Sequence, residues 1–246
     1  SVRLLRASKN SIMAESWQPA VPGARQGQAG RNAIQLVIMS KEHLARRFKT
    51  RIARDIGVVP ATWFDRHNLA AVTARLSRDP RWQTLFSVAP ATATASRCLP
   101  PAVPRVAQKA GDIGQRMQAI FDGAAPGPVV VIGTDIPTVR PSHIAAAFRA
   151  LGDNDVVFGP ATDGGFWLVG LRRTPRVMNA FHDVRWSTAD TLRDCLDGLC
   201  RTRTVRVATV STLRDADERA DFVVLKAAIG RRIVSPAAAA KLEVNY

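Results

Sequence analysis

Short apolar runs alternate with helical stripes over most of the chain. Residues 33–39 (AIQLVIM) and 84–90 (TLFSVAP) are apolar runs of strand length, and residues 67–77 between them have helical spacing. The proline-rich stretch 97–106 (RCLPPAVPRV) that follows is typical of a loop. This part of the chain therefore predicts two strands, an intervening helix and a long loop.

Two helices with clear starts are predicted next. Asp112 has the position of an N-cap, because a helical stripe of apolar residues follows it directly. The members of that stripe are Ile113, Met117, Ile120 and Phe121. Pro141 opens the second helix and Gly152 closes it, in keeping with the preference for proline in the first turn and glycine just past the end.

The runs around these helices predict buried strands. Residues 129–133 (VVVIG) begin with four apolar residues, which indicates a strand buried on both faces, as in a parallel sheet. Further strands are predicted at residues 155–159, 166–171 and 204–210. Ser187 and Asp190 have the spacing of a capping box and predict the start of a third helix there.

The alternation of strands and helices predicts one three-layer α/β domain with a mostly parallel sheet. We place this domain at residues 33–230. Residues 1–32 have no steady period and carry five Lys or Arg against one Glu, so we expect a flexible basic extension. Residues 231–246 are expected to form a C-terminal tail.

The charge of the chain favours anionic partners without identifying them. Its 246 residues contain 35 Lys and Arg against 20 Asp and Glu, a formal net charge of +15. Such a field attracts nucleic acid, acidic membranes, or nucleotides and phosphorylated metabolites. No basic stretch is interleaved with aromatic residues, and the chain has one Tyr, so nucleic acid is not the favoured partner.

Cysteine usage and hydropathy narrow the class further. Cys98, Cys195 and Cys200 form no CxxC pair and support neither a disulfide framework nor a zinc site. We expect Cys195 and Cys200 to be small core residues of a helix. No apolar stretch approaches the ~20 residues of a membrane span, and the N-terminal residues lack a signal-peptide core. A cytoplasmic protein is the expectation, with its oligomeric state open.

Cations are dense directly after the first predicted strand, in residues 41–55 (KEHLARRFKTRIARD). A strand followed by a cation-rich loop that enters a helix holds phosphates well, by charge and by helix N-terminal amides. The glycines and the GK[ST] ending of a P-loop are absent. The alternative is a solvated basic helix.

Three acidic residues, at two positions along the chain, follow predicted strands. Asp135 lies in GTDIP after the strand at 129–133, and Asp215 and Asp217 lie in RDAD after the last strand. Ligands of parallel sheets bind beyond the carboxyl ends of the strands, and Mg²⁺ or Mn²⁺ is held there by one or two carboxylates plus substrate phosphates. For Asp135 the alternative is a turn residue before proline, and for Asp217 it is a helix cap.

A third acidic position precedes paired glycines. Asp163, Gly164 and Gly165 stand before the apolar strand at 166–171. The glycines let a backbone approach a ligand closely, and Asp163 is suited to bind a hydroxyl or to act as a base. A plain β-turn is the alternative, because Asp and Gly are the residues that tight turns use.

Six segments, taken in this order, resemble a bacterial family of glycosyltransferase-A-like proteins known as radical-SAM/selenodomain-associated transferases. They are FKTRI, QKAGDIGQRM, VVVIGTDIPTV, VVFGPATDGGFWLVGL, FHDVRWSTADTL and RDAD. The resemblance runs from about Ile34 to about Leu225. A more distant one is to 2-phospholactate guanylyltransferase and the molybdenum-cofactor guanylyltransferases.

The resemblance implies a three-layer α/β nucleotide-diphospho-sugar transferase (GT-A-like) fold. It also implies roles, residue by residue. Phosphates would be held by Lys49 and Arg51, and a Mg²⁺ or Mn²⁺ ion by Asp135, Asp217 and Asp215. Base or ribose contacts would come from Gln108, Gly111 and Asp112, and the acceptor pocket would be bordered by Asp163, Gly164 and Gly165. The catalytic set is then Asp135, Lys49 and Asp163.

Three functions follow as hypotheses. The first is a metal-dependent transferase that uses a nucleotide sugar and a small-molecule acceptor. The second is a nucleotidyltransferase that joins an NTP to a phosphorylated metabolite. The third is a non-catalytic protein that binds nucleotide or nucleic acid. The third is kept because the stretch HLARRFKTRI lacks the Pro-Gly pair that the family usually has shortly before its Lys-Thr-Arg.

Overall fold

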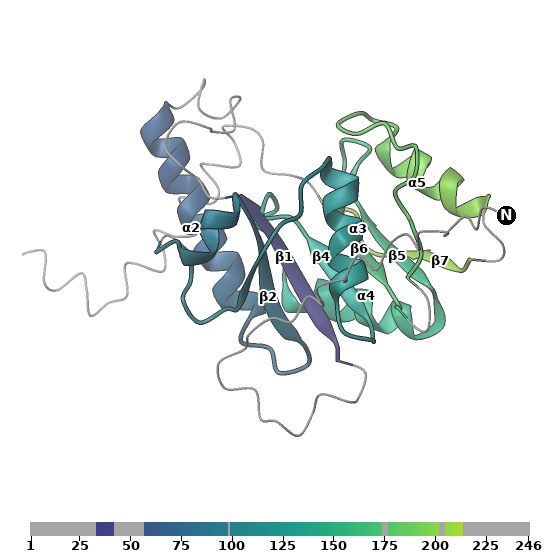
Figure 1. The fold of residues 1–246 in the computed structure, drawn as a ribbon, viewed down its shortest axis with the longest axis horizontal. Coiled ribbons are helices and arrows are strands. Elements are labelled where there is room, and N and C mark those ends of the chain that lie inside the picture. The colour runs from purple at the N-terminus through teal and green to yellow at the C-terminus, as the bar shows by residue number, and fades with distance from the viewer. Residues whose placement is uncertain (1–32, 42–56, 98, 174–176, 202–204, 214–246) are drawn as a thin grey trace, which may run out of the picture.

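The computed structural model describes residues 33–41, 57–97, 99–173, 177–201 and 205–213. They form a seven-stranded sheet with the strand order β3-β2-β1-β4-β6-β5-β7 (Figure 1). The strands are β1 Gln35–Lys41, β2 Gln83–Ala89, β3 Arg105–Ala107, β4 Val129–Ile132, β5 Val156–Pro160, β6 Phe166–Leu171 and β7 Val207–Thr209. The helices are α2 Val58–Leu76, α3 Ile113–Gly123, α4 Pro141–Asp153 and α5 Thr191–Cys200, with a 3₁₀ turn η1 at Ala91–Ala95.

One strand of this sheet runs against the other six. Strands β3, β2, β1 and β4 are parallel to one another, and β7 is parallel to β5. Strand β6 is antiparallel to both of its neighbours, β4 and β5. The mostly parallel sheet that the sequence predicts is therefore confirmed.

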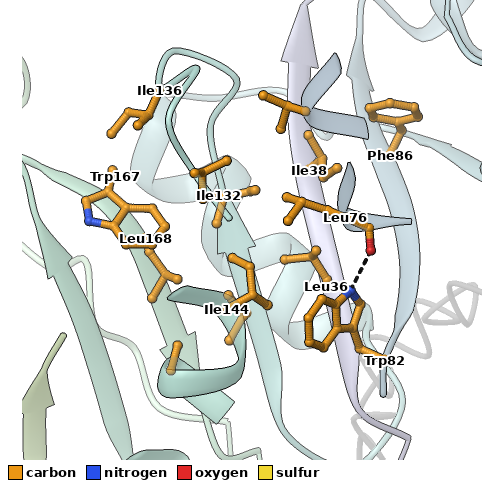
Figure 2. Packing of buried hydrophobic residues seen from close by; sticks show 14 of the residues in the cluster. Leu36, Ile38, Leu76, Trp82, Phe86, Ile132, Ile136, Ile144, Trp167 and Leu168 are labelled. Carbon is orange, nitrogen blue, oxygen red and sulfur yellow. Dashed lines mark hydrogen bonds between the residues drawn. The ribbon is translucent and has the colours of Figure 1, made fainter. Parts of the chain in front are cut away.

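Helices cover both faces of the sheet, which gives three layers (Figure 1). On β1, Leu36 and Ile38 pack in the cluster that contains the buried residues of α2 and α4, whereas Val37 packs with those of α3 and α5. This alternation follows from the two-residue repeat of a strand. Figure 2 shows the first cluster, in which the Trp82 Nε1 donates to the Leu76 carbonyl oxygen at 3.0 Å.

The predicted cap of α3 is confirmed in detail. The Asp112 carboxylate accepts a hydrogen bond from the Gln115 amide at 2.8 Å, and the Gln115 side chain accepts one from the Asp112 amide at 2.9 Å. These two bonds form a capping box, which satisfies amides that the first helical turn leaves without partners. The helix ends at Gly123, and Ala124 is its C-cap.

The predicted start of α5 is wrong by three residues. Ser187 has a φ of 60°, and Asp190 is the N-cap, with no side-chain capping bond. The segment before the helix is instead held by Thr191, whose hydroxyl lies 2.9 Å from the Arg185 carbonyl oxygen. The Asp190 carboxylate pairs with the Arg185 guanidinium at 3.0 Å. Contacts with Arg185, earlier in the same loop, therefore replace the side-chain cap.

Two further expectations need correction. The loop predicted at 97–106 contains the start of β3, because Arg105 begins a short strand beside β2. Cys195 is buried as expected, but Cys200 is exposed, since it is the last residue of α5 and lies off its apolar face. None of the helices in the described ranges has the length and apolar character needed to cross a bilayer.

Candidate active site at the carboxyl edge of the sheet

Asp135 lies on a loop that α2 holds in place. Strand β4 ends at Ile132, and Asp135 is exposed three residues further on. The buried side chain of Asn68 donates to the Thr134 carbonyl oxygen at 2.7 Å. Arg75, about two turns further along the same helix, donates to the Pro137 carbonyl oxygen at 2.9 Å.

That guanidinium also donates to the Val139 carbonyl oxygen. A loop that would otherwise need water to satisfy its carbonyls is therefore bound to a helix on both sides of its carboxylate. Such fixation is what a preorganised ligand site requires, because a mobile loop would have to be ordered on binding.

A small pocket, open to solvent, lies beside this loop. The pocket is lined by Ile132, Gly133, Asp135, Ile136, Val139, Phe166 and Trp167. Figure 2 shows Ile132, Ile136 and Trp167 near one another, on the side of the sheet covered by α2 and α4. Its lining brings the end of β4 together with the start of β6, which runs antiparallel beside it.

The Asp163 stretch forms the tight hairpin that joins β5 to β6. The Gly164 amide donates to the Ala161 carbonyl oxygen at 3.3 Å, and the Ala161 amide donates to the Gly165 carbonyl oxygen at 3.0 Å. Gly164 has a φ of 88°. This is a three-residue hairpin loop with glycine at its left-handed position.

The Asp163 carboxylate has a role in that turn. It accepts a hydrogen bond from the Gly165 amide at 2.9 Å, as aspartates of tight turns do. The turn is fixed against the start of α5, because the Leu192 amide donates to the Gly164 carbonyl oxygen at 3.1 Å. Turn chemistry therefore accounts for these three residues. They lie at the same edge of the sheet as Asp135, but they do not line the pocket beside it.

The residues expected near the base also have structural roles. The Gln108 Nε2 lies 3.2 Å from the Ser40 carbonyl oxygen and 2.8 Å from that of Ser87, so it joins the carboxyl ends of β1 and β2. Gly111 has a φ of 122°, and its carbonyl oxygen accepts from the Arg116 Nε at 2.8 Å. With the Asp112 cap, these contacts shape the turn between β3 and α3.

The remaining predicted residues lie outside the described residues. Lys49 and Arg51 fall between Lys41 and Gly57, and Asp215 and Asp217 follow Leu213. Within the described part of the chain, His, Cys, Asp and Glu side chains gather nowhere in groups of three that would hold a metal ion. The metal and phosphate roles of these residues stay predictions.

Sequence reasoning missed the aromatic wall of the pocket. Phe166 and Trp167 follow the Asp-Gly-Gly turn directly, where the sequence pattern indicates only an apolar strand. Trp167 is 6% exposed, and its Nε1 donates to the Ser211 carbonyl oxygen at 3.1 Å. A side-chain atom on Gly159 would lie 2.6 Å from this indole, so the glycine makes room for it. Two adjacent aromatics after a glycine turn were the available signal.

A histidine supports this wall from α4. The His143 ring lies edge-on to Trp167, with 6.1 Å between the ring centroids. Its Nδ1 accepts a hydrogen bond from the Arg140 amide at 3.2 Å. Burial lowers the pKa of His143, and the charge of Arg140 lowers it further, so the imidazole is neutral at pH 7.

The chain resembles known proteins in sequence and in structure. The family model described as "uncharacterized protein conserved in bacteria (DUF2064)" matches residues 72–188. None of the curated proteins matches the chain in sequence. The crystal structure of a protein from Desulfovibrio desulfuricans G20, provisionally named a nucleotide-diphospho-sugar transferase, superposes with a TM-score of 0.71 at 25% identity. The similarity covers 85% of this chain and 94% of that chain.

Two more distant structures share the fold. One is a nucleotidyl transfer enzyme from Methanothermobacter, with a TM-score of 0.54 at 14% identity over 82% of this chain and 100% of that one. The other is a cytidylyltransferase from Leptospira borgpetersenii, with a TM-score of 0.52 at 13% identity over 82% and 88%. The narrower resemblances, to radical-SAM-associated transferases and to 2-phospholactate guanylyltransferase, stay predictions. The chain thus has the nucleotide-diphospho-sugar transferase (GT-A-like) fold, and its central residues are similar to the DUF2064 family.

Proposed function

We propose that this chain is a metal-dependent transferase that acts on a nucleotide-activated substrate, and that this substrate is a nucleotide sugar. The placement of Asp135 carries the proposal: its loop follows a central strand, is fixed by α2, and borders an open pocket. In open α/β sheets, ligands bind at this edge. The likeness to the Desulfovibrio protein supports nucleotide sugars as the donor class.

The described residues are compatible with a divalent cation. Mg²⁺ is held by one or two carboxylates together with substrate phosphate oxygens, so the exposed Asp135 fits as a ligand. When bound, the ion would neutralise charge on the leaving nucleotide. Asp215 and Asp217 are the proposed further ligands. Leu213, which precedes them, pairs with Ala161 next to the hairpin turn at this edge.

The chain's own residues divide the remaining work. Lys49 and Arg51 are proposed to neutralise the phosphates, in a segment that follows the carboxyl end of β1. Gln108 is proposed to contact the base through its side-chain oxygen, because its nitrogen is used by the strand carbonyls. Gly111 and Asp112 are proposed to border the nucleotide through the turn that they form.

The acceptor side of the site is proposed to lie between the pocket and the hairpin turn. Asp163 is exposed there, with one carboxylate oxygen bonded to the Gly165 amide. Its other oxygen is proposed to bind an acceptor hydroxyl or to accept its proton. Gly164 and Gly165 would allow the acceptor to approach the backbone.

Thermal unfolding with nucleotides tests the proposal. The panel is nucleoside triphosphates, nucleoside diphosphates and nucleotide sugars, each with and without Mn²⁺ or Mg²⁺. A ligand at about 100 times its Kd adds about 2.7 kcal/mol to the free energy of unfolding, which is a visible rise in Tm for a chain of this size. We expect a rise that requires both the metal and one nucleotide class.

Two variants sharpen this test. Asp135→Asn removes the charge of the proposed metal ligand, and Asp153→Asn removes that of an exposed carboxylate at the end of α4. We expect the metal-dependent rise to be lost only in Asp135→Asn, with both variants folded. A rise that survives in Asp135→Asn would remove Asp135 from the metal role. A nucleotide response that ignores metal and falls steeply with salt would favour the non-catalytic hypothesis.

Nucleotidyl transfer is the second candidate, because solved structures with this fold include nucleotidyltransferases. The product separates the two reactions. Transfer from a nucleotide sugar releases a nucleoside diphosphate, whereas nucleotidyl transfer from an NTP releases pyrophosphate. A coupled pyrophosphate assay with each NTP therefore distinguishes them.

A further inference from the structure

Trp186 lies between the two halves of the proposed site. We infer that its indole contacts the transferred group of the donor, the part between the nucleotide and the acceptor, and that its N–H donates to an oxygen of that group. The inference rests on the proposed function, because it assigns a residue to one part of that substrate. It is carried by the position of the indole, by its N–H, and by the way in which its segment is fixed.

The indole packs on the first turn of α3. A Cβ on Gly114 would lie 3.0 Å from the Trp186 Cε2 and closer still to its Cζ2, so the glycine leaves the space that the ring occupies. Glycine lowers the stability of a helix, yet here it seats an aromatic side chain. Because Nε1 is bonded to Cε2, the N–H edge lies close to the turn of Gly111 and Asp112, which is proposed to border the nucleotide.

The same residue also lies beside the hairpin half of the site. The centroid of its ring is 6.4 Å from that of Phe166, the first residue of β6, which lines the pocket beside Asp135. Three residues after Trp186, the Ala189 backbone packs against Gly164 of the hairpin turn. Trp186 therefore lies between the turn proposed for the nucleotide and the turn proposed for the acceptor. A transferase has to hold the transferred group between these two partners.

The N–H of Trp186 differs from two others. The Trp82 Nε1 donates to the Leu76 carbonyl oxygen at 3.0 Å. The Trp167 Nε1 donates to the Ser211 carbonyl oxygen at 3.1 Å. The Trp186 N–H donates to no acceptor in the part of the chain that the structure describes, and its side chain is half-buried. Since indole N–H groups find a hydrogen-bond partner when they leave water, this one is available to a ligand.

Packing alone would not require an indole at this position. Phe166 and Phe181 belong to the same apolar cluster, with 6.5 Å between their ring centroids, and the Phe181 centroid lies 6.0 Å from that of Trp186. A phenylalanine in place of Trp186 would make similar apolar contacts without an N–H. The tryptophan adds a directed hydrogen-bond donor on a rigid ring, which suits an oxygen of the substrate.

The segment that carries the indole is fixed on both sides. The Arg185 amide donates to the Asp194 Oδ2 at 3.0 Å, and the Arg185 Nε donates to the same oxygen at 2.9 Å. Further along, the Leu192 amide donates to the Gly164 carbonyl oxygen at 3.1 Å. A donor that is held in this way needs little ordering when a substrate binds, as a contact residue of a preorganised site requires.

The same substitution at two tryptophans tests the inference. Trp186→Phe removes the N–H and keeps an aromatic ring beside Gly114. Trp82→Phe is the matched control, because Trp82 precedes β2 at the opposite edge of the sheet and its N–H has a structural bond. Isothermal titration calorimetry on the full chain with Mg²⁺ measures the Kd of each probe. The probes are UDP-glucose, GDP-mannose, ADP-glucose and CDP-glucose, each compared with its own nucleoside diphosphate.

The two variants should behave in opposite ways. We expect Trp186→Phe to raise the Kd of the bound nucleotide sugar about threefold to tenfold, the effect of one neutral hydrogen bond. The Kd of the corresponding nucleoside diphosphate and the Tm without ligand should stay close to those of the parent chain. We expect Trp82→Phe to lower the Tm and to leave the Kd of both probes unchanged.

The indole N–H signals in NMR spectra of the isotope-labelled chain give a direct readout. The signals of Trp186 and Trp82 are assigned by their loss in the two variants. Without ligand, the Trp186 N–H should exchange with solvent faster than the Trp82 N–H. The nucleotide sugar with Mg²⁺ should shift the Trp186 signal and slow its exchange, and the nucleoside diphosphate should not.

Three results would overturn the inference. They are a Kd of the nucleotide sugar that Trp186→Phe leaves unchanged or raises no more than that of the diphosphate, a Trp186 N–H as protected as that of Trp82 in the free chain, and a Trp186 signal that the nucleotide sugar does not move. In each case, a metal-dependent rise in Tm of the parent chain leaves the proposed function standing. If no nucleotide or nucleotide sugar raises the Tm, the proposed function is contradicted, and the inference fails with it.

Discussion

Two adjacent glycines in the β5–β6 turn should respond very differently to the same substitution. Gly164 has a φ of 88°, and a Cβ on it would lie 2.6 Å from the Ala189 Cα and closer still to that residue's carbonyl oxygen. Gly165 has no left-handed φ, and a Cβ on it would meet the Asp163 Oδ1 at 3.2 Å. The first clash is with backbone and the second is with the end of a side chain.

The structure gives the size of the difference. For Gly164→Ala, the left-handed conformation costs about 1–2 kcal/mol, and the overlap with the Ala189 backbone adds about 1–3 kcal/mol. The free energy of unfolding should therefore fall by roughly 2–5 kcal/mol. For Gly165→Ala, a small shift of the Asp163 side chain relieves the contact. The alanine also reduces the flexibility of the unfolded chain, which raises the free energy of unfolding by about 0.4–1 kcal/mol and offsets the cost of that shift.

Urea unfolding followed by far-UV circular dichroism measures both variants against the parent chain. We expect a large shift of the midpoint for Gly164→Ala with an unchanged slope, and a shift below about 1 kcal/mol for Gly165→Ala. Equal stabilities within about 0.5 kcal/mol would refute the reasoning, because they would show that the turn does not rest on the segment before α5. If Gly165→Ala were the more destabilised variant, the left-handed position of the turn would belong to Gly165 and not to Gly164.

Three further predictions concern the helices. Asp112→Ala should lower the free energy of unfolding by about 1 kcal/mol in urea titrations, because it removes the side-chain cap of α3. The hydrogen bond to Arg185 lowers the pKa of Asp194 to about 2, so this pair stabilises the fold above pH 3.8 and loses its effect as the pH falls from there toward 2. In the Arg185→Ala variant, an NMR titration that follows the side-chain carboxyl carbons should show the pKa of Asp194 close to its ordinary value. A pKa of Asp194 equal to that in the parent chain would contradict the pairing. Burial raises the pKa of Cys195 to about 12, so iodoacetamide at pH 8 should label Cys200 and leave Cys195 unmodified until the chain unfolds, as peptide mass spectrometry will show.

The fold was largely predictable because its strands and helices carry strong local signals. The four consecutive apolar residues of β4 and the Asp112 cap are patterns that the local backbone obeys directly. Strand β3 carries no such signal. Its three residues follow several prolines, and it is fixed by tertiary contacts in which the Arg105 guanidinium donates to the carbonyl oxygens of Ser96 and Leu99.

The prediction of where α5 starts was wrong for a related reason. Ser187 and Asp190 have the spacing of a capping box, but Arg185 binds the groups that this box would need. Its guanidinium pairs with the Asp190 carboxylate, and its carbonyl oxygen accepts a hydrogen bond from the Thr191 hydroxyl. A pattern of two residues cannot show that a third, earlier in the chain, will compete for them. Capping rules hold when no other nearby residue binds the same groups.

The candidate site likewise contains one residue that the sequence predicts and others that it does not. Asp135 was found because it directly follows a strand that the sequence marks clearly, and the edge of a parallel sheet is a general place for ligands. The residues that fix its loop were not found, because Asn68 and Arg75 precede it by more than 50 positions and look like ordinary polar residues of a helix. Their role depends on which face of α2 packs over the end of β4, and one sequence does not contain that information.

The antiparallel strand explains why the pocket has an aromatic wall at all. In a fully parallel sheet, the first residues of every strand lie at the edge opposite the ligand site. Strand β6 reverses this, so that Phe166 and Trp167 at its start lie beside the residues that follow the end of β4. The hairpin turn of Asp163 and Gly164 makes the reversal, because it sends the chain back after β5 within three residues. The Asp-Gly-Gly motif therefore acts on the site through topology: its turn chemistry is what brings the aromatic wall to the edge where Asp135 lies.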